Sequence, residues 1–236
     1  MIDTTNNTVI KTIALQGSPV GLAMAPNHRT LYVADWFSDK ILAINTANYD
    51  DRREVIVAKA PSGLVVSADS NTLFVAARDS NEVAVIDSKS FSISKRIKVG
   101  KHPFGLSLDS NARLYVVNVY DNTVSAINTN TWAQSLIKVG EHPYCAVASA
   151  DNKTLYVTNT QDDTVSVIDL TTHQTITQID VGMTPEGISY DALSQQVLAA
   201  SWGENKVSVI NAKTNKLIKH INTGDKSRAF GEFILQ

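Results

Sequence analysis

The sequence is poor in cysteine, with Cys145 alone among 236 residues, so no disulfide can form within the chain. Hydrophobic residues make up 43% of it, yet no apolar run approaches the ~18 residues that a membrane-spanning helix needs. No window of about 12 residues carries apolar side chains at helical spacing either. These absences exclude a disulfide-stapled fold and a helical membrane protein, and they argue against helices as building elements.

An excess of charge of one sign is also missing. Lys and Arg number 21 against 23 Asp and Glu, which gives a net charge of −2. This balance argues against a general electrostatic affinity for duplex nucleic acid or anionic lipid. The first residues lack the basic and apolar regions of a secretion signal, so the sequence as given favours a cytoplasmic protein.

A short motif recurs along the chain: a small residue, a proline, any residue and usually a glycine. The prolines of successive copies lie 40 to 42 residues apart. The five copies are Ser18-Pro19-Val20-Gly21, Ala60-Pro61-Ser62-Gly63, His102-Pro103-Phe104-Gly105, His142-Pro143-Tyr144-Cys145 and Thr184-Pro185-Glu186-Gly187. A repeat of this length is typical of propellers and solenoids.

Further apolar runs follow each copy at constant spacing. One is Leu155-Tyr156-Val157, the next is Val165-Ser166-Val167-Ile168, and a last run closes the unit, as in Ile179-Asp180-Val181-Gly182. Each run is short, rich in Val, Ile and Tyr, and bounded by Asn, Asp, Gly, Ser and Thr, which predicts strands and turns. The alternation in Val165–Ile168 predicts a half-buried strand. Each unit is therefore expected to be a four-stranded antiparallel meander.

Such sheets bury their faces by stacking radially around an axis, which defines an all-β, β-propeller fold. The segments Leu155-Tyr156-Val157-Thr158-Asn159 and Asp163-Thr164-Val165-Ser166-Val167-Ile168-Asp169 resemble the YVTN family of propeller repeats, of the YncE-like and surface-layer type. The resemblance implies a single propeller domain over residues 1–236 and, since related repeat proteins are often exported, leaves the compartment open. It says little about function, because that family serves many ends.

We expect six blades, with a thin closing blade shared by both termini. The complete blades are predicted at about 18–59, 60–101, 102–141, 142–183 and 184–225, and the closing blade at 1–17 plus 226–236. In that blade, Thr8–Leu15 reads as an outer strand and Ala229–Leu235 as an inner strand, while a Leu-Tyr-Val strand is missing. A longer, seven-bladed parent is the alternative.

Positions that vary between repeats gather at one rim of the predicted ring, where loops around the axis open. Aromatic rings are concentrated there, and in a repeat fold a diverging rim is where a binding surface is expected. We predict a non-catalytic binding or scaffold propeller whose axial face holds a peptide, a partner protein or a small ligand, acting as a monomer or weak oligomer. The predicted ligand-binding residues are Trp36, Phe37, Arg78, Asp79, Phe104, Tyr120, Tyr144, Trp202 and Arg228.

The alternative hypothesis is a metal-dependent hydrolase, lactonase or lyase at the channel mouth. Oxygen ligands at the ends of equivalent strands suit calcium or magnesium, and some six-bladed lactonases hold a metal in this way. The residues of this alternative are Glu186, Asp35, Asn118 and Asn159. Asn118 and Asn159 are otherwise expected to be turn residues that bond their own backbone.

Two further possibilities are weaker. His102 and His142 occupy equivalent positions in adjacent repeats and, with Cys145, offer a minor metal-site alternative. Single-stranded nucleic acid stacked on the rings ranks third, because only Arg78 and Arg228 supply positive charge at this rim. We predict no cofactor, and no nucleophile elbow, phosphate loop or dinucleotide fingerprint occurs.

Overall fold

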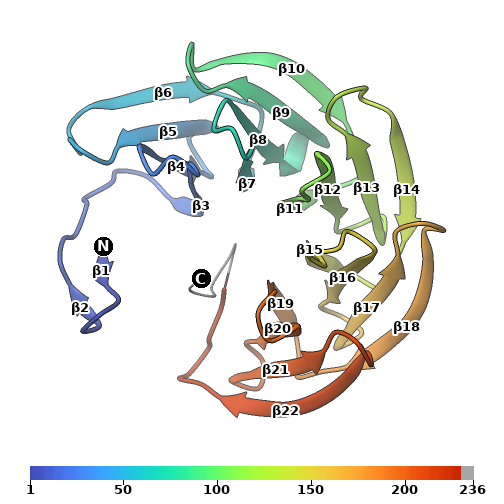
Figure 1. Cartoon of the computed structure of the whole chain (residues 1–236). Helices are drawn as coiled ribbons and strands as arrows, with labels where there is room; N and C mark the ends of the chain where they lie inside the picture. The colour runs from blue at the N-terminus through green and yellow to red at the C-terminus, as the bar shows by residue number, and fades with distance from the viewer. Residues whose placement is uncertain (230–236) are drawn as a thin grey trace.

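The computed structural model describes residues 1–229, which form six antiparallel sheets arranged around one axis (Figure 1). Five sheets have four strands, and the sixth is the two-stranded hairpin of β1 (Ile2–Asp3) and β2 (Thr8–Val9). The predicted all-β propeller is confirmed. The described residues contain a single 3-10 turn, η1 (Arg78–Ser80), and no helix that could cross a membrane.

Each four-stranded blade is a meander that runs from the axis to the periphery (Figure 1). Blade 1 comprises β3 (Pro19–Met24), β4 (Thr30–Asp35), β5 (Lys40–Asn45) and β6 (Arg52–Ile56). Blade 2 comprises β7 (Pro61–Val66), β8 (Thr72–Ala77), β9 (Glu82–Asp87) and β10 (Ser92–Lys98). Blade 3 comprises β11 (Pro103–Leu108), β12 (Arg113–Asn118), β13 (Thr123–Asn128) and β14 (Gln134–Lys138). Blade 4 comprises β15 (Pro143–Ala148), β16 (Thr154–Asn159), β17 (Thr164–Asp169) and β18 (Gln174–Asp180). Blade 5 comprises β19 (Pro185–Asp191), β20 (Gln196–Ser201), β21 (Lys206–Asn211) and β22 (Lys216–Asn222).

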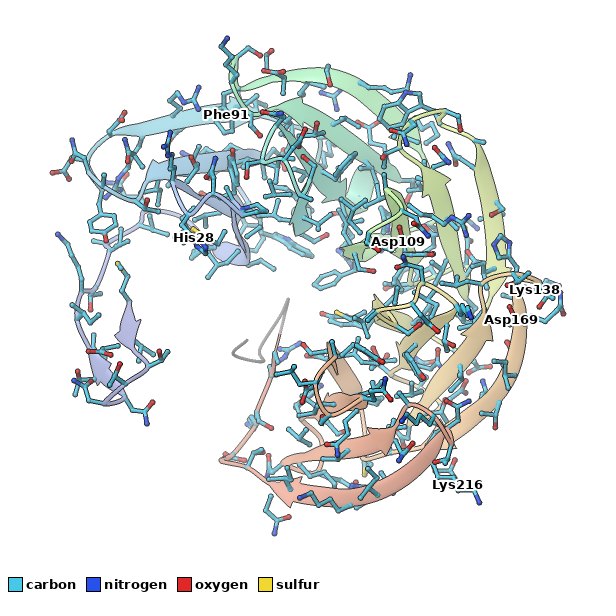
Figure 2. All side chains as sticks on the ribbon, in the orientation of Figure 1. His28, Phe91, Asp109, Lys138, Asp169 and Lys216 are labelled. Carbon is cyan, nitrogen blue, oxygen red and sulfur yellow. The ribbon has the colours of Figure 1, made fainter. Side chains whose placement is uncertain are left out.

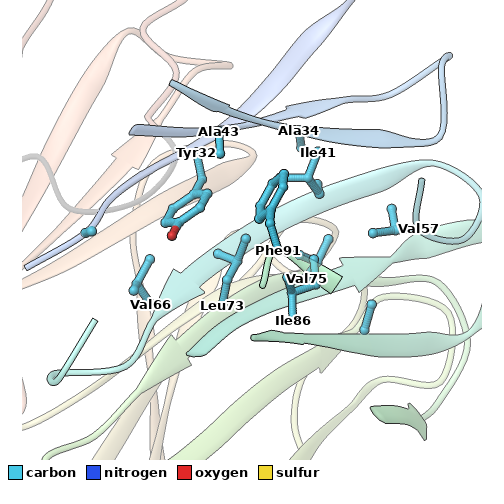
Figure 3. Close-up of a cluster of buried hydrophobic side chains, with 12 residues drawn as sticks. Tyr32, Ala34, Ile41, Ala43, Val57, Val66, Leu73, Val75, Ile86 and Phe91 are labelled. Carbon is cyan, nitrogen blue, oxygen red and sulfur yellow. The ribbon is translucent and has the colours of Figure 1, made fainter. Parts of the chain in front are cut away.

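The hydrophobic core lies between neighbouring blades. Between blades 1 and 2, Tyr32 and Ile41 face Leu73 and Ile86, and none of these side chains is more than 1% exposed (Figure 3). Similar clusters join the later blades. Radial stacking therefore removes the apolar faces from water, which is the main stabilising term of this fold.

The middle strands of blades 2 to 4 are buried on both faces, which corrects the expectation of a half-buried strand at Val165–Ile168. Ser166 is 0% exposed, as are Val165 and Val167. Blade 4 has a neighbouring blade on each side, so its alternate face carries the small hydroxyl of Ser166 in place of a larger, solvent-facing polar residue. The outer strands do meet water, and Lys138 and Lys216 project from β14 and β22 away from the axis (Figure 2).

The glycine of the repeated motif allows inner strands to approach closely. A Cβ on Gly63 would lie 2.2 Å from the carbonyl oxygen of Phe104, and one on Gly105 would lie 2.4 Å from that of Tyr144. Both distances are far below contact, so only glycine fits without moving the backbone. The residue before each glycine, such as Phe104, is thereby held at the axis.

A side chain in each middle turn fastens the blade to the linker that follows. Asn81 (φ 53°) accepts a 2.9 Å hydrogen bond from the backbone N–H of His102, and Asn122 (φ 53°) accepts one of 3.0 Å from His142. Asn and Asp tolerate this left-handed backbone better than other non-glycine residues. Asp39, Asp163 and Asn205 accept the same bond from the backbone N–H of Ala60, Thr184 and Lys226.

The N-terminal hairpin repeats the outer hairpin of the complete blades. Ile2 pairs with Val9 as Ile168 pairs with Thr175 in blade 4. The predicted outer strand Thr8–Leu15 is shorter than expected, because β1 offers only two residues for pairing and the strand ends at Val9. The predicted inner strand at the C-terminus lies, beyond Ala229, outside the described residues.

Candidate functional site

Aromatic side chains from three blades meet at the axis. Trp36 follows β4, Phe104 lies in β11 and Tyr144 lies in β15. The ring centroids of Trp36 and Phe104 are 6.2 Å apart, and those of Phe104 and Tyr144 are 4.3 Å apart and stacked. These separations are those of interacting aromatic pairs. Residues between 40 and 108 positions apart in sequence thus form one continuous ring surface.

A pocket of about 440 Å³ opens over this surface. Its lining is Ser18, Pro19, Val20, Trp36, Phe37, Phe104, Tyr144 and Arg228. Phe104 is only 7% exposed and forms the floor, whereas Phe37 is 82% exposed at the rim. The structure therefore brings five of the nine predicted binding residues to one pocket. We name it the axial pocket.

Arg228, on one side of the axial pocket, belongs to an ion pair. Arg228 donates two 2.6 Å hydrogen bonds to the carboxylate of Glu186, which is 4% exposed. The hydrogen bond to Glu186 raises the pKa of Arg228 above its usual value. Burial, and then the Glu186 carboxylate, raise the pKa of Tyr144, so this phenol stays protonated. Arg228 also lies 5.4 Å from the ring centre of Trp202, which places Trp202 beside the pocket.

A second arginine approaches from blade 2. The guanidinium of Arg78, in η1, lies 5.2 Å from the ring centre of Trp36, within the range of a cation–π contact. Arg78 also pairs with Asp79 at 2.9 Å. Arg78 and Trp202 therefore contact the five predicted residues of the pocket, so seven of the nine predicted residues are joined by contacts. Asp79 is joined to them through its ion pair with Arg78.

Tyr120 belongs to a different cluster. Its ring stacks on His102 with centroids 4.1 Å apart and meets the edge of His142 at 5.4 Å. The ring of Tyr120, which is 52% exposed, thus contacts both imidazoles of the minor metal-site alternative. Within residues 1–229, no three His, Cys, Asp or Glu side chains are grouped to hold a metal ion.

The asparagines of the hydrolase alternative have structural partners. The amide of Asn118 donates to the hydroxyls of Thr123 (3.0 Å) and Ser125 (2.9 Å). Asn159 repeats this pattern in blade 4 with Thr164 and Ser166. The expectation that these asparagines bond their own backbone was wrong, because the paired middle strand places hydroxyls opposite them.

The acidic residues of the same alternative are also engaged. Asp35 accepts a 3.1 Å hydrogen bond from the backbone of Ser18. Burial disfavours its charge, but hydrogen bonds from Ser18 and Ser38 outweigh burial and hold its pKa below the usual value. Glu186 is bound to Arg228. These four side chains come from four different blades, and each forms a hydrogen bond to a residue of the protein.

A small cavity of about 40 Å³, close to the space of a single water molecule, lies among the inner strands of blades 1 to 4. Its lining is Val20, Gly21, Leu22, Ser62, Gly63, Leu64, Phe104, Gly105, Leu106 and Cys145. A ligand of larger size therefore fits the axial pocket and not this cavity.

Three pocket residues, Ser18, Pro19 and Val20, are not among the nine predicted binding residues. Ser18 and Pro19 belong to the part of the motif that repeats in every blade, which is typical of a scaffold. Pro19 is exposed, whereas Pro61, Pro103, Pro143 and Pro185 are buried. The thin closing blade predicted in the sequence could have indicated this difference, because a blade with few strands covers little of the inner strand of blade 1.

The fold and site define the class of the protein, a β-propeller with an aromatic axial pocket. No known protein family and no curated protein matches the sequence. Among solved structures, the chain is similar to hydrazine synthase from Kuenenia stuttgartiensis, with a TM-score of 0.67 and 15% identity over 93% of this chain and 91% of that one. It is similar to virginiamycin B lyase from Staphylococcus aureus, with a TM-score of 0.75 and 15% identity over 87% and 70% of the two chains.

A further similar structure is the dihydro-heme d1 dehydrogenase NirN in complex with DHE. Its TM-score is 0.74 at 17% identity, and the match covers 94% of this chain and 51% of that protein, so this chain spans about half its length. These identities show the shared propeller fold alone. The fold carries several activities, and the function of this chain has to be argued from its own pocket.

Proposed function

We propose that this chain is a non-catalytic binding propeller that holds a peptide, a partner protein or a small ligand in the axial pocket. The observation that carries the proposal is the convergence of Trp36, Phe37, Phe104, Tyr144 and Arg228 on one pocket of about 440 Å³. Ligand sites commonly measure about 300–1,000 Å³, with aromatic walls and a few polar groups.

We also propose that the repeats belong to the YVTN family, on the motif of residues 155–159.

The exposed ring of Phe37 supports the proposal further. A phenyl group that is 82% exposed adds nothing to the core, and aromatic side chains are favoured anchors at binding surfaces. It stands at the rim of a floor made by Phe104, which is buried. A ligand that covers Phe37 would gain apolar contact area without any rearrangement of the blades.

A displayed library of random peptides, together with a fragment screen by ligand-observed NMR, tests the proposal. Ligands recovered on the intact chain are then titrated against Phe37→Ala and against Leu193→Ala. Leu193 is 92% exposed in the β19–β20 turn, which opens on the opposite face, so it is a matched control. Phe37→Ala is expected to weaken binding about tenfold. Equal affinity for both variants would contradict the proposal.

The hydrolase alternative has one observation in its favour. Asn118 Oδ1 and Asn159 Oδ1 are buried and have no hydrogen-bond partner among the described residues. Melting temperatures in calcium, magnesium, manganese and zinc, each with and without chelator, separate the two functions. A rise in one metal that Asn118→Ala removes supports the alternative, and unchanged melting in all four removes it.

A further inference from the structure

The axial pocket has a positively charged side. The side chain of Arg228 is 48% exposed, whereas that of its partner Glu186 is 5% exposed. The cation therefore faces solvent while its counter-ion lies beneath the surface, so the pair presents positive potential to an incoming ligand. Among the described residues that line the pocket, Arg228 carries the formal charge.

Resting on the binding function proposed above, we propose that the axial pocket recognises an aromatic ring with a carboxylate a few bonds away. Two sources offer this chemistry: a free aryl acid, and the C-terminal aromatic residue of a peptide. The ring enters the pocket beside Phe37, and the carboxylate meets the guanidinium of Arg228.

The ring half of the ligand follows from the aromatic surface. Phe104 and Tyr144 are stacked with centroids 4.3 Å apart, and Trp36 continues the surface at 6.2 Å from Phe104. A flat ring laid on this surface gains offset or edge contacts of the same kind. The volume of about 440 Å³ accommodates one or two such rings.

The carboxylate half follows from Arg228. A guanidinium presents five N–H donors in a planar fork that matches carboxylates, and two of its hydrogen bonds go to Glu186. Arg228 and Tyr144 line the same pocket, and Glu186 and then Tyr144 contribute to the raised pKa of Arg228. The cation therefore lies close to the aromatic surface, so a ligand ring on Tyr144 brings an attached carboxylate to Arg228.

Arg228 also decides against an organic cation. Aromatic walls alone would suit a quaternary ammonium group, because the ring faces attract positive charge. The guanidinium of Arg228 at the same wall repels such a ligand, and the ring of Trp36 is already in contact with the guanidinium of Arg78, which is paired with Asp79. The charge distribution of the pocket therefore favours an anionic aromatic ligand.

Calorimetry on the intact chain tests the inference with matched probes. Indole-3-acetate is compared with indole-3-acetamide and tryptamine, and N-acetyl-Ala-Ala-Trp with its C-terminal amide. We expect each acid to bind about tenfold tighter than its amide, since hydrogen bonds to charged groups are the stronger ones. Binding of the small acid alone assigns a free aryl acid, and binding of the peptide acid alone assigns a C-terminus.

Equal binding of acids and amides, tighter binding of tryptamine, or no binding by any probe would each overturn the inference. The proposed function is judged separately, by the peptide and fragment selection and its Phe37→Ala control. A selection that recovers ligands without an aromatic acid therefore refutes the carboxylate inference and leaves the binding function standing.

Two variants locate the carboxylate preference. Arg228→Gln is compared with Arg96→Gln, because Arg96 is 43% exposed and pairs with Glu82, which is 7% exposed, on the outer part of blade 2. The double variant Glu186→Gln/Arg228→Gln removes the charge at Arg228 without leaving a buried carboxylate unpaired. We expect the acid-to-amide ratio to fall from about 10 to about 1 in the double variant and to persist in Arg96→Gln. A ratio that persists in the double variant would refute the role of Arg228.

Discussion

Arg228 Nε and Nη2 each lie 2.6 Å from an oxygen of the Glu186 carboxylate, which ties the segment after the fifth blade to the inner strand of that blade. Removal of the arginine leaves a carboxylate that is 5% exposed without its partner. We therefore expect Arg228→Gln to lower the free energy of unfolding by about 1–3 kcal/mol, below the value for fully buried pairs because Arg228 is half-exposed.

Urea denaturation measures this loss. The double variant Glu186→Gln/Arg228→Gln is expected to recover most of the stability, because two amides can hydrogen-bond without a buried charge. If the single and double variants were equally unstable, the arginine would act through its packing and not through the ion pair.

The lowered pKa of Glu82 predicts that this residue stabilises the fold at neutral pH and loses that effect in acid. Burial alone would raise its pKa, but hydrogen bonds from Lys98 and Arg96 outweigh burial and lower the pKa below 4.5. A carboxyl whose folded pKa lies below its unfolded value stabilises the fold above the unfolded pKa, and this contribution is lost as the pH falls through the folded one.

Glu82→Gln should therefore reduce the free energy of unfolding at pH 7 and flatten its decline below about pH 4.5. Urea titrations between pH 7 and pH 3 provide the measurement. Glu54→Gln serves as a control, since the Glu54 side chain is 54% exposed and pairs with Lys40 at the surface. Parallel pH profiles for the wild-type chain and Glu82→Gln would contradict the prediction.

Substitutions at the turn residue Asn122 distinguish the stabilising effect of its hydrogen bond from the cost of its left-handed backbone conformation. It accepts a bond from His142 and adopts a φ of 53°. Asn122→Gly loses the bond alone and should lower the free energy of unfolding by about 1 kcal/mol, whereas Asn122→Ala also strains the backbone and should lower it by about 2 kcal/mol. Thermal denaturation ranks the two variants, and a glycine variant as unstable as the alanine variant would show that the left-handed backbone is unimportant.

Gly105 tests the close approach of the inner strands. An added Cβ would lie 2.4 Å from the carbonyl oxygen of Tyr144, a backbone atom that cannot rotate away. Gly105→Ala should destabilise the chain by about 1–3 kcal/mol. Gly224→Ala is the matched control, because nothing lies within 4 Å of its added Cβ. Equal melting temperatures for the two variants would contradict this packing.

Cys145 should be an unreactive thiol. Burial, and then the nearby Glu186 carboxylate, raise the pKa of Cys145 to about 12, so little thiolate exists at pH 8. A colorimetric disulfide reagent is expected to label the native chain far more slowly than the chain unfolded in urea. Equal labelling rates would indicate that the blade around Cys145 opens readily.

The propeller was predictable because its signal is local and repeated. Each strand is a short run of β-branched and aromatic residues, and the spacing of the prolines states how many units the chain holds. The residue before each motif glycine was also predictable as an axial position, which placed Phe104, Tyr144 and Glu186 at one rim. Tyr120 was grouped with them because its loop lies on the same rim, although its ring contacts His102.

Side-chain partners were less accessible to sequence reasoning. The sequence suggests Glu186 as a metal ligand in the hydrolase alternative, whereas the structure pairs it with Arg228, 42 residues further along the chain. Asn118 was read as a self-bonded turn residue, yet it donates to Thr123 and Ser125 on the next strand. Rotamers and cross-strand register decide such contacts, and a repeat pattern contains neither.

The sequence by itself determined the strand pattern, the radial stacking and the rim at which residues diverge, because hydrophobic alternation and turn chemistry act over a few residues. Only the tertiary structure decided that Trp36, Phe104 and Tyr144 touch, that Arg228 stands beside them and that the inner strands of blades 1 to 4 leave only a small cavity between them. The physical reason is that these contacts join blades far apart in sequence, and their distances depend on how tightly the glycine-bearing inner strands pack around the axis.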